Sequence, residues 1–445
     1  MKKIALAALF FSGFALAGAS CGSSSSNSNA TTGGTGGNGT ASAVPNPAMT
    51  TPDAAAWAIF IQAVSPAAGE GTVFETWASD TDTFTPGGKF PGTRDPLDLR
   101  PAVLPEVDRA SRAAAGATPH AQLGAPARRT SGAALGTATP TVAAVGPFPP
   151  APSTEPGADG KLLEEVRRNR PAFDFIVNNH LNARSGLVAA FKANMDVVFP
   201  TDSVEVKTNW LPASLIPQYY AGAKESDFYV VNVRGKPYAM IAMHVISKQV
   251  PNWTWATFEH QGNLGRCDFI GCNDLYGAAA QHVPPADNQG QNQGTAYPPC
   301  AKSAAVKADL SAAGVAAVFS NYCLKGSQAD FTDNTGLAIR LGNSVTEYNF
   351  VWQASCMTCH GVANFDASGK STTIFGFLNG KGQLGTIDPV NYWNTAAMRP
   401  PIYQGMPGLV RNAVSADFVW SIPFCAYDDV TDPKKPAINP KCVGK

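Results

Sequence analysis

The sequence predicts a mixed α+β fold, in which an antiparallel sheet is flanked by helices. Residues 204–207 alternate between apolar and charged side chains, and residues 253–258 alternate again. Between them, the β-branched and aromatic runs 227–233 and 238–246 flank the short turn 234–236. Two such runs joined by a short turn are typical of a β-hairpin. The predicted sheet therefore lies in the middle of the chain.

Helices are expected on both sides of this sheet along the sequence. Residues 161–170 have the charge pattern of a helix start, Pro171 interrupts it, and residues 172–181 resume an apolar helical period. The Ala-rich stretch 302–323 is also predicted to be helical in spite of Gly314.

The N-terminus has the features of an export signal. Lys2 and Lys3 precede the apolar run 4–16, and small residues follow up to Ser20. Such a run is too short to cross a membrane as a helix. We therefore predict a signal peptide at residues 1–20.

Cys21 follows this signal directly, in an arrangement that resembles the bacterial lipoprotein signal and implies lipidation of Cys21. That signal usually has Leu where this chain has Gly18, so ordinary cleavage after Ala17 or Ala19 is the alternative. Residues 21–52 consist mainly of Ser, Asn, Gly and Thr, a composition that predicts a disordered tether.

Composition beyond the tether indicates a loop-rich globular protein. Of the 445 residues, 44% are hydrophobic and only 15% are charged, with 42 Gly and 35 Pro. Lys plus Arg equals Asp plus Glu at 33 each, and the zero net charge argues against a nucleic-acid partner or a polybasic membrane contact. We expect an α+β domain at 53–335, with a Pro- and Ala-rich insertion at 101–157, and then a C-terminal region at 336–445.

Residues 356–360, Cys-Met-Thr-Cys-His, are a complete C-x-x-C-H string, which is the attachment site of a c-type haem. Two thiols one helical turn apart add to the vinyl groups of one haem, and the adjacent His reaches the iron from the proximal side. A redox or zinc Cys-x-x-Cys pair is the alternative, but a zinc site needs a second ligand pair with metal spacing. The string therefore predicts one covalent haem c, held by Cys356, Cys359 and His360.

The other cysteines are expected to form structural disulfides. Removing Cys21, Cys356 and Cys359 from the nine leaves six, an even number that an exported protein can oxidise to three bridges. Fifteen pairings are compatible with six cysteines. We expect pairing between neighbours in the chain: Cys267–Cys272, Cys300–Cys323 and Cys425–Cys442.

Residues around the string follow a recognisable order. They are Gly342, Tyr348 and Phe350 before it, Gly361 directly after it, and later Met406-Pro407 and residues 415–420. This order resembles the class I cytochromes c, which implies a mostly α-helical, cytochrome c-like haem region at 336–445 with Met406 as the distal iron ligand. Residues 342–353 are rich enough in helix-compatible residues to carry the string at the end of a helix. Two features depart from the family: Pro423 shortens the last helix, and a Pro-containing segment soon after the string is missing.

The distal position has other candidates. Met398 is also in range, whereas Met357 lies inside the string and cannot reach the other face of the iron. His260 follows Glu259 at a predicted strand end, where it either binds iron or forms a proton-transfer pair with Glu259. His244 is a weaker candidate of the same kind, and for both histidines a hydrogen-bonded structural role is the ordinary alternative. An open distal position is the remaining hypothesis.

Three further segments, 206–210, 253–260 and 343–348, resemble a group of uncharacterised bacterial exported proteins that end in a C-x-x-C-H region. The resemblance covers most of the chain and implies that the sheet and the haem region belong to one unit. It implies no activity.

Electron transfer is the function that these features favour. His and Met on the two axial faces hold the iron low-spin and leave no position for a substrate. The chain would exchange single electrons with a redox partner protein or a small-molecule donor or acceptor, in the periplasm or as an outer-membrane lipoprotein of a Gram-negative bacterium.

Two other hypotheses remain open. The first is a haem enzyme with an open distal site for peroxide or oxygen chemistry, or an oxidoreductase that passes electrons from the α+β domain to the haem; no G-x-G-x-x-G follows a predicted strand. The second is a haem-based sensor or binding lipoprotein.

Overall fold

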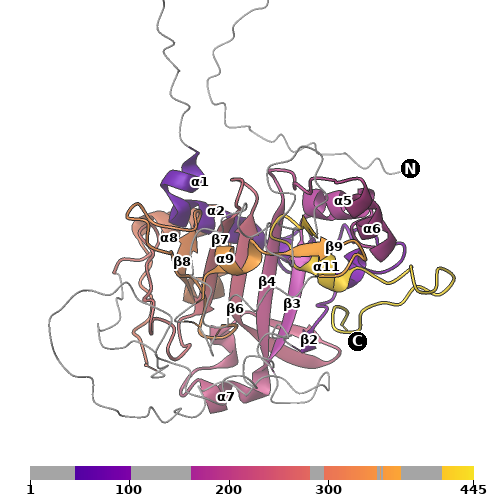
Figure 1. Ribbon diagram of the computed structural model, residues 1–445. Coiled ribbons are helices and arrows are strands. Elements are labelled where there is room, and N and C mark those ends of the chain that lie inside the picture. The colour runs from indigo at the N-terminus through magenta and orange to yellow at the C-terminus, as the bar shows by residue number, and fades with distance from the viewer. Residues whose placement is uncertain are drawn as a thin grey trace, which may run out of the picture. The chain divides into compact units, whose positions relative to one another are not determined.

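An antiparallel sheet of eight strands is the main element of the computed structural model (Figure 1). The structure describes residues 46–101, 162–280, 295–347, 351, 354–371 and 413–444. Within them the strand order is β1-β3-β4-β6-β7-β8, with β2 beside β3 and β5 beside β6. The strands are β1 (Ala78–Ser79), β2 (Arg100–Pro101), β3 (Leu163–Arg168), β4 (Val204–Pro212), β5 (Val230–Val233), β6 (Lys236–Ser247), β7 (Thr254–His260) and β8 (Tyr322–Gln328). A second sheet pairs β9 (Asn364–Asp366) with β10 (Ala413–Ser415).

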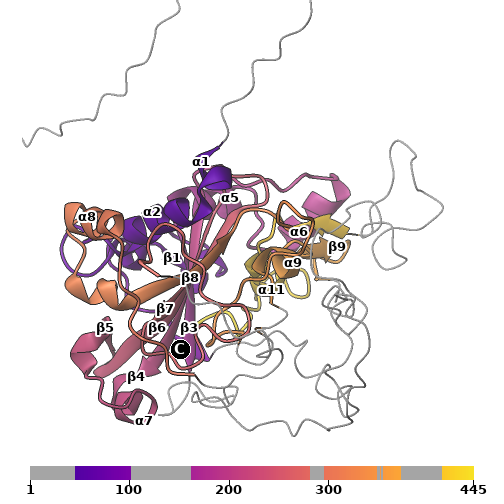
Figure 2. The same cartoon turned by 90° about the vertical axis from the view of Figure 1, so that its left-hand side faces the viewer.

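Helices lie on both faces of the large sheet, with α2 and α8 on one side and α6, α9 and α11 on the other (Figure 2). The described helices are α1 (Pro47–Thr50), α2 (Pro52–Val64), α3 (Asp80–Thr83), α5 (Arg170–Asn178), α6 (Arg184–Lys192), α7 (Ile216–Tyr219), α8 (Ala304–Ala312), α9 (Cys356–His360) and α11 (Ser421–Cys425). Short 3-10 turns are η1 (Val73–Thr76), η2 (Ala213–Leu215), η3 (Glu225–Asp227) and η4 (Ala317–Asn321). The predicted α+β class is therefore confirmed.

The predicted hairpin in the middle of the chain is confirmed as the pair β5 and β6. Val233 pairs with Lys236, so the turn consists of Arg234 and Gly235. Their φ angles are 52° and 81°. Two successive positive φ values give the type I′ turn, whose twist matches that of the flanking strands.

Alternation along the strands divides the core into two layers. Val245 and Phe258 point to the side covered by α2, where Phe258 stacks on Phe60 with ring centroids 4.0 Å apart. Ile246 and Trp255 point to the opposite side and join a second cluster there. That cluster also contains Met357, Phe365 and Val414 from the C-terminal part of the chain. The C-x-x-C-H string is therefore packed against the sheet.

Strand β3 replaces the helix that we predicted at 161–170. Its charged side chains suggest an exposed helix, but in the structure they are buried and form ion pairs within β3 and with α3 and β4. Arg168 bonds Asp80 and, at 3.3 Å, Glu205. Arg167 bonds Glu165 at 2.7 Å. The ion pairs formed in the folded protein thus stabilise a strand here, although the local charge pattern favours a helix.

Other predicted helices are shorter than expected or absent. Within 302–323 the helix α8 ends before Gly314, whose φ of +63° terminates it, and β8 begins at Tyr322. Within 342–353, residues 342–347 form a turn, and 415–420 includes Asp417 and Phe418 with positive φ. The described part of 336–445 thus contains only the short helices α9 and α11 with the β9–β10 pair, and a mostly α-helical cytochrome region is not confirmed.

All described residues belong to one compact unit, Pro45–Lys445, so the sheet and the described part of 336–445 share a core. The predicted tether at 21–52 ends earlier than expected, because α1 begins at Pro47. The predictions for the signal peptide at 1–20, for Cys21 and for nearly all of the insertion at 101–157 fall outside the described residues.

None of the helices that the structure describes is both long and apolar enough to cross a membrane.

We predict that Arg168→Ala lowers the free energy of unfolding by about 3–5 kcal/mol, because it leaves the buried Asp80 and Glu205 carboxylates without this partner. Arg170→Ala is the control: Arg170 is 61% exposed, and losing its ion pair with Asp174 should cost about 1 kcal/mol or less. Urea denaturation of both variants measures the difference, and equal losses would contradict the account.

Candidate haem attachment site

Strand β8 positions the start of helix α9. Gln328, the last residue of β8, donates from Nε2 to Ser355 Oγ at 3.1 Å and accepts at Oε1 from the Met357 backbone N–H at 3.2 Å. Ser355 is the N-cap, and its Oγ accepts from the Thr358 backbone N–H. The helix that carries the string is therefore tied at its first turn to the sheet.

Just before this helix, the backbone at Leu341 and Gly342 lies very close to Ala354. The Leu341 N–H donates to the Ala354 carbonyl at 3.0 Å, and a Cβ on Gly342 would lie 2.6 Å from Ala354 Cβ. Only glycine fits at position 342. This accounts for Gly342, one of the residues on which the resemblance to class I cytochromes c is based.

The helix turns its reactive side chains outward. Met357 and Thr358 are 0% and 1% exposed, whereas Cys356, Cys359 and His360 are partly exposed. Positions i, i+3 and i+4 share one helix face, so the two sulfurs and the imidazole are presented together. This is the arrangement that a planar group bound at all three positions requires.

His360 is held in one tautomer. Its Nδ1 lies 2.8 Å from the Phe418 carbonyl oxygen, which can only accept, so Nδ1 carries the proton and Nε2 keeps its lone pair. The ring centroid lies 4.6 Å from that of Trp255. Burial lowers the pKa of His360 to about 4, so the imidazole is neutral at pH 7. A neutral imidazole with a fixed Nδ1–H is the form that ligates iron.

A strained turn supplies that carbonyl. Asp417 and Phe418 have φ angles of 48° and 72°, a conformation that costs each of them about 1–3 kcal/mol. Asp417 is fixed by Lys248 Nζ, 2.6 Å from its Oδ1, and by the Phe199 N–H, 2.8 Å from its Oδ2. The buried ion pair thus aims the Phe418 carbonyl at His360.

The cysteine thiols of α9 are not activated as nucleophiles. Desolvation, followed by the nearby Glu347 carboxylate, raises the pKa of Cys359 to about 12 and that of Cys356 well above its ordinary value. In catalytic Cys-x-x-Cys motifs, the pKa of the attacking cysteine thiol is instead lowered. The redox alternative for this string is therefore disfavoured by its surroundings.

His244 lies on the same face of the sheet as the string, whereas His260 does not. His244 Nε2 is 3.5 Å from Glu347 Oε1 and 3.0 Å from Asn343 Nδ2. Side chains alternate along β7, so His260 points to the side of Phe258, opposite Trp255.

The structure does not bring His260 together with the string or with the Glu259 carboxylate. His260 Nε2 lies 3.1 Å from the Asp227 carbonyl, its Nδ1 accepts from the Gly262 N–H at 3.2 Å, and its ring stacks on Phe228. Both nitrogens are occupied. Glu259 points to the other face, where it accepts from Ser344 and Asn263. These contacts hold both side chains in place within the fold.

The other candidate ligands, Met406 and Met398, lie outside the described residues, as does Cys21. Among the residues that the structure describes, no group of three or more His, Cys, Asp or Glu side chains could hold a metal ion.

Sequence reasoning missed several residues that position the site: Gln328, the pair Lys248 and Asp417, and the Phe418 carbonyl. A backbone carbonyl leaves no signal in residue identity. Lys248 and Asp417 are 169 residues apart in the chain, so no local pattern links them.

Comparisons with known proteins found no matching family model, no matching curated protein and no matching solved structure.

The burial of neutral His260 should make stability depend on pH. Burial lowers the pKa of His260 to about 4, below its ordinary value of 6.5, so the unfolded chain binds this proton first. The contribution of His260 is complete above pH 6.5 and falls by about 3 kcal/mol as the pH drops to 4. We expect His260→Gln to flatten the plot of unfolding free energy against pH over this window. Identical slopes in the variant and the parent protein would show that His260 is not buried in its neutral form.

Proposed function

We propose that this chain is an exported c-type cytochrome that carries one haem at Cys356 and Cys359, with His360 as the proximal ligand, and that transfers single electrons. The observation that carries the proposal is the geometry of α9. Two thiols and a neutral imidazole share one partly exposed helix face, and the imidazole Nδ1–H donates a hydrogen bond to the Phe418 carbonyl.

The residues present fit the haem. Cys356 and Cys359 are unpaired, whereas the six other described cysteines form disulfides. Covalent attachment through two thiols needs both of them outside disulfides, as they are here, and both residues are partly exposed. His360 would hold the iron through Nε2. The haem supplies reversible one-electron chemistry at its iron.

The chain's own residues set the conditions for that chemistry. The Phe418 carbonyl accepts a hydrogen bond from His360 Nδ1–H, which would raise the basicity of Nε2, and the Trp255 ring contacts the imidazole. Gln328 and Ser355 hold α9 against the sheet, so the site does not need to reorganise when an electron arrives. These features suit a carrier.

The disulfides agree with an exported location. Cys267–Cys272, Cys300–Cys323 and Cys425–Cys442 are all formed, which confirms the pairing that we expected. Bridges of this kind persist outside the cytoplasm. With the predicted signal at 1–20 and lipidation at Cys21, they support a periplasmic protein or an outer-membrane lipoprotein.

Optical spectra of protein matured in a periplasm test the axial ligation. We expect a low-spin ferric spectrum and a reduced form that does not bind carbon monoxide, since the proposal has Met406 as the distal ligand. Met406→Ala should convert the ferric form to high spin, and Met398→Ala should leave it low-spin.

If the reduced parent protein readily bound carbon monoxide, this would contradict the proposal that the chain is an electron carrier. It would favour the two alternatives that need an open distal position, the haem enzyme and the haem-based sensor.

A further inference from the structure

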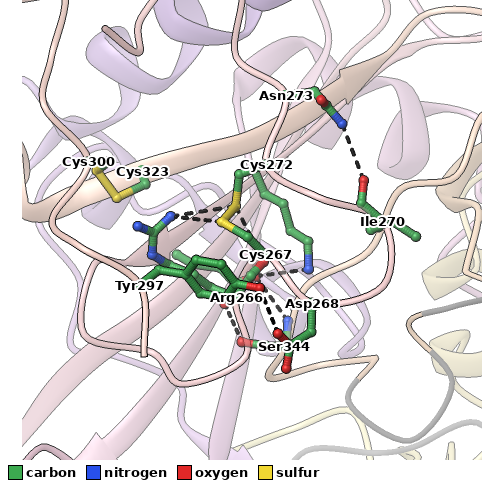
Figure 3. The surroundings of a disulfide bond; sticks show 12 residues. Arg266, Cys267, Asp268, Ile270, Cys272, Asn273, Tyr297, Cys300, Cys323 and Ser344 are labelled. Carbon is green, nitrogen blue, oxygen red and sulfur yellow. Dashed lines mark hydrogen bonds and ion pairs between the residues drawn. A yellow bond between two sulfur atoms is a disulfide. The ribbon is translucent and has the colours of Figure 1, made fainter. Parts of the chain in front are cut away.

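Two of the disulfides lie close together at one end of β8 (Figure 3). Cys272 from the first bridge and both Cys300 and Cys323 from the second line a single small cavity of about 10 Å³. Two cationic side chains, Arg266 and Lys302, line the same cavity. Four sulfurs and two positive charges are thus gathered in one place, away from α9.

Both cations hydrogen-bond sulfur. Lys302 Nζ lies 2.7 Å from Cys300 Sγ. Arg266 Nη1 lies 3.2 Å from Cys267 Sγ and 3.5 Å from Cys272 Sγ. Arg266 and Lys302 are only 1% and 7% exposed, so solvent screens their charges little.

These charges are compensated only in part, because the direct hydrogen bonds of both cations go mainly to neutral groups. The other hydrogen bonds that Arg266 makes within the described residues go to the carbonyls of Gln261 and Pro298, and Lys302 bonds the Cys300 carbonyl. Asp274 also lines the cavity and attracts Lys302, while its carboxylate accepts from Trp57 Nε1 and from the Gly277 N–H, and Glu259 attracts Arg266. A new negative charge on a cavity sulfur would therefore be favoured.

Reduction of a disulfide produces such a charge. A cation beside a cysteine lowers the pKa of its thiol and stabilises the thiolate. Stabilising the reduced form raises the reduction potential of the bridge, which becomes easier to reduce than an ordinary structural one. Cys300 is the accessible sulfur here, because it is half-buried while Cys323 is 3% exposed.

We propose that Cys300–Cys323 is a redox-active disulfide that accepts an electron pair from an exported dithiol. This site goes beyond the haem, which exchanges one electron at a time, and does not depend on it.

The proposed exchange has two steps. A thiolate of the donor attacks Cys300 Sγ, the Cys300–Cys323 bond breaks, and its electron pair leaves on Cys323 Sγ. The second thiolate of the donor then attacks the donor sulfur in the mixed disulfide and displaces Cys300 Sγ as a thiolate, which Lys302 stabilises. The donor ends as a disulfide, the chain gains two electrons, and the two thiolates take up protons from solvent.

The test is an equilibrium titration of the full chain in buffers of reduced and oxidised dithiothreitol. Acid quenching, alkylation and peptide mass spectrometry then report each bridge separately. Cys425–Cys442 is an internal control, because no hydrogen-bond donor among the described residues reaches either of its sulfurs. We expect Cys300–Cys323 to be reduced in at least tenfold less reducing buffer than Cys425–Cys442, a difference of about 30 mV or more for a two-electron couple.

Variants at Lys302 distinguish an effect of its positive charge on the disulfide from a loss of the fold. Lys302→Met should move the midpoint of Cys300–Cys323 about tenfold toward more reducing buffer, and Lys302→Arg should largely restore it. Cys425–Cys442 should keep its midpoint in both variants, which shows that the fold is intact. Reduction of all three bridges in a single step, or an unchanged Cys300–Cys323 midpoint in folded Lys302→Met, would overturn the proposal.

Discussion

The hydrogen bond between His360 Nδ1–H and the Phe418 carbonyl is the interaction on which the candidate site depends. It fixes the tautomer of His360 and orients its ring, and it exists only because Asp417 and Phe418 adopt a strained backbone. The Lys248–Asp417 ion pair holds that strain, and Lys248 directly follows strand β6. The sheet thus reaches the imidazole through two contacts, the Lys248–Asp417 ion pair and the hydrogen bond between Phe418 and His360.

Strand β8 connects the two redox chemistries that we propose. At its end Gln328 holds the first turn of α9, and near its beginning Cys323 forms the disulfide beside Lys302 and Arg266. Five residue steps along the strand separate these positions by roughly 16 Å. As the edge strand of the sheet, paired along its length with β7, β8 would hold the proposed one-electron and two-electron sites at a constant separation. This gives the sheet a positioning role that a small carrier of about 100 residues, with a single core, cannot provide.

The local sequence pattern predicted the features that depend on residues near one another in the chain. The β5–β6 hairpin follows from a Gly-containing turn between β-branched runs, and the three disulfides join cysteines only 5, 23 and 17 residues apart. Strand β3 could not be predicted, because its charges are neutralised by partners such as Asp80 and Glu205 that are distant in sequence. Cys356, Cys359 and His360 could be proposed from the sequence because haem attachment would require their fixed spacing. The Phe418 carbonyl, Lys248 and the unexpected turn at 415–420 depend on tertiary packing alone.

Covalent attachment of haem tests the central claim most directly. The chain should be produced with a periplasmic c-type maturation system, digested, and its peptides measured by mass spectrometry. The account predicts that the peptide containing Cys356 and Cys359 carries the mass of one haem, and that Cys356→Ser with Cys359→Ser abolishes it while the three disulfides still form. A native peptide with two free thiols, or with a Cys356–Cys359 disulfide, from fully matured protein would contradict the account.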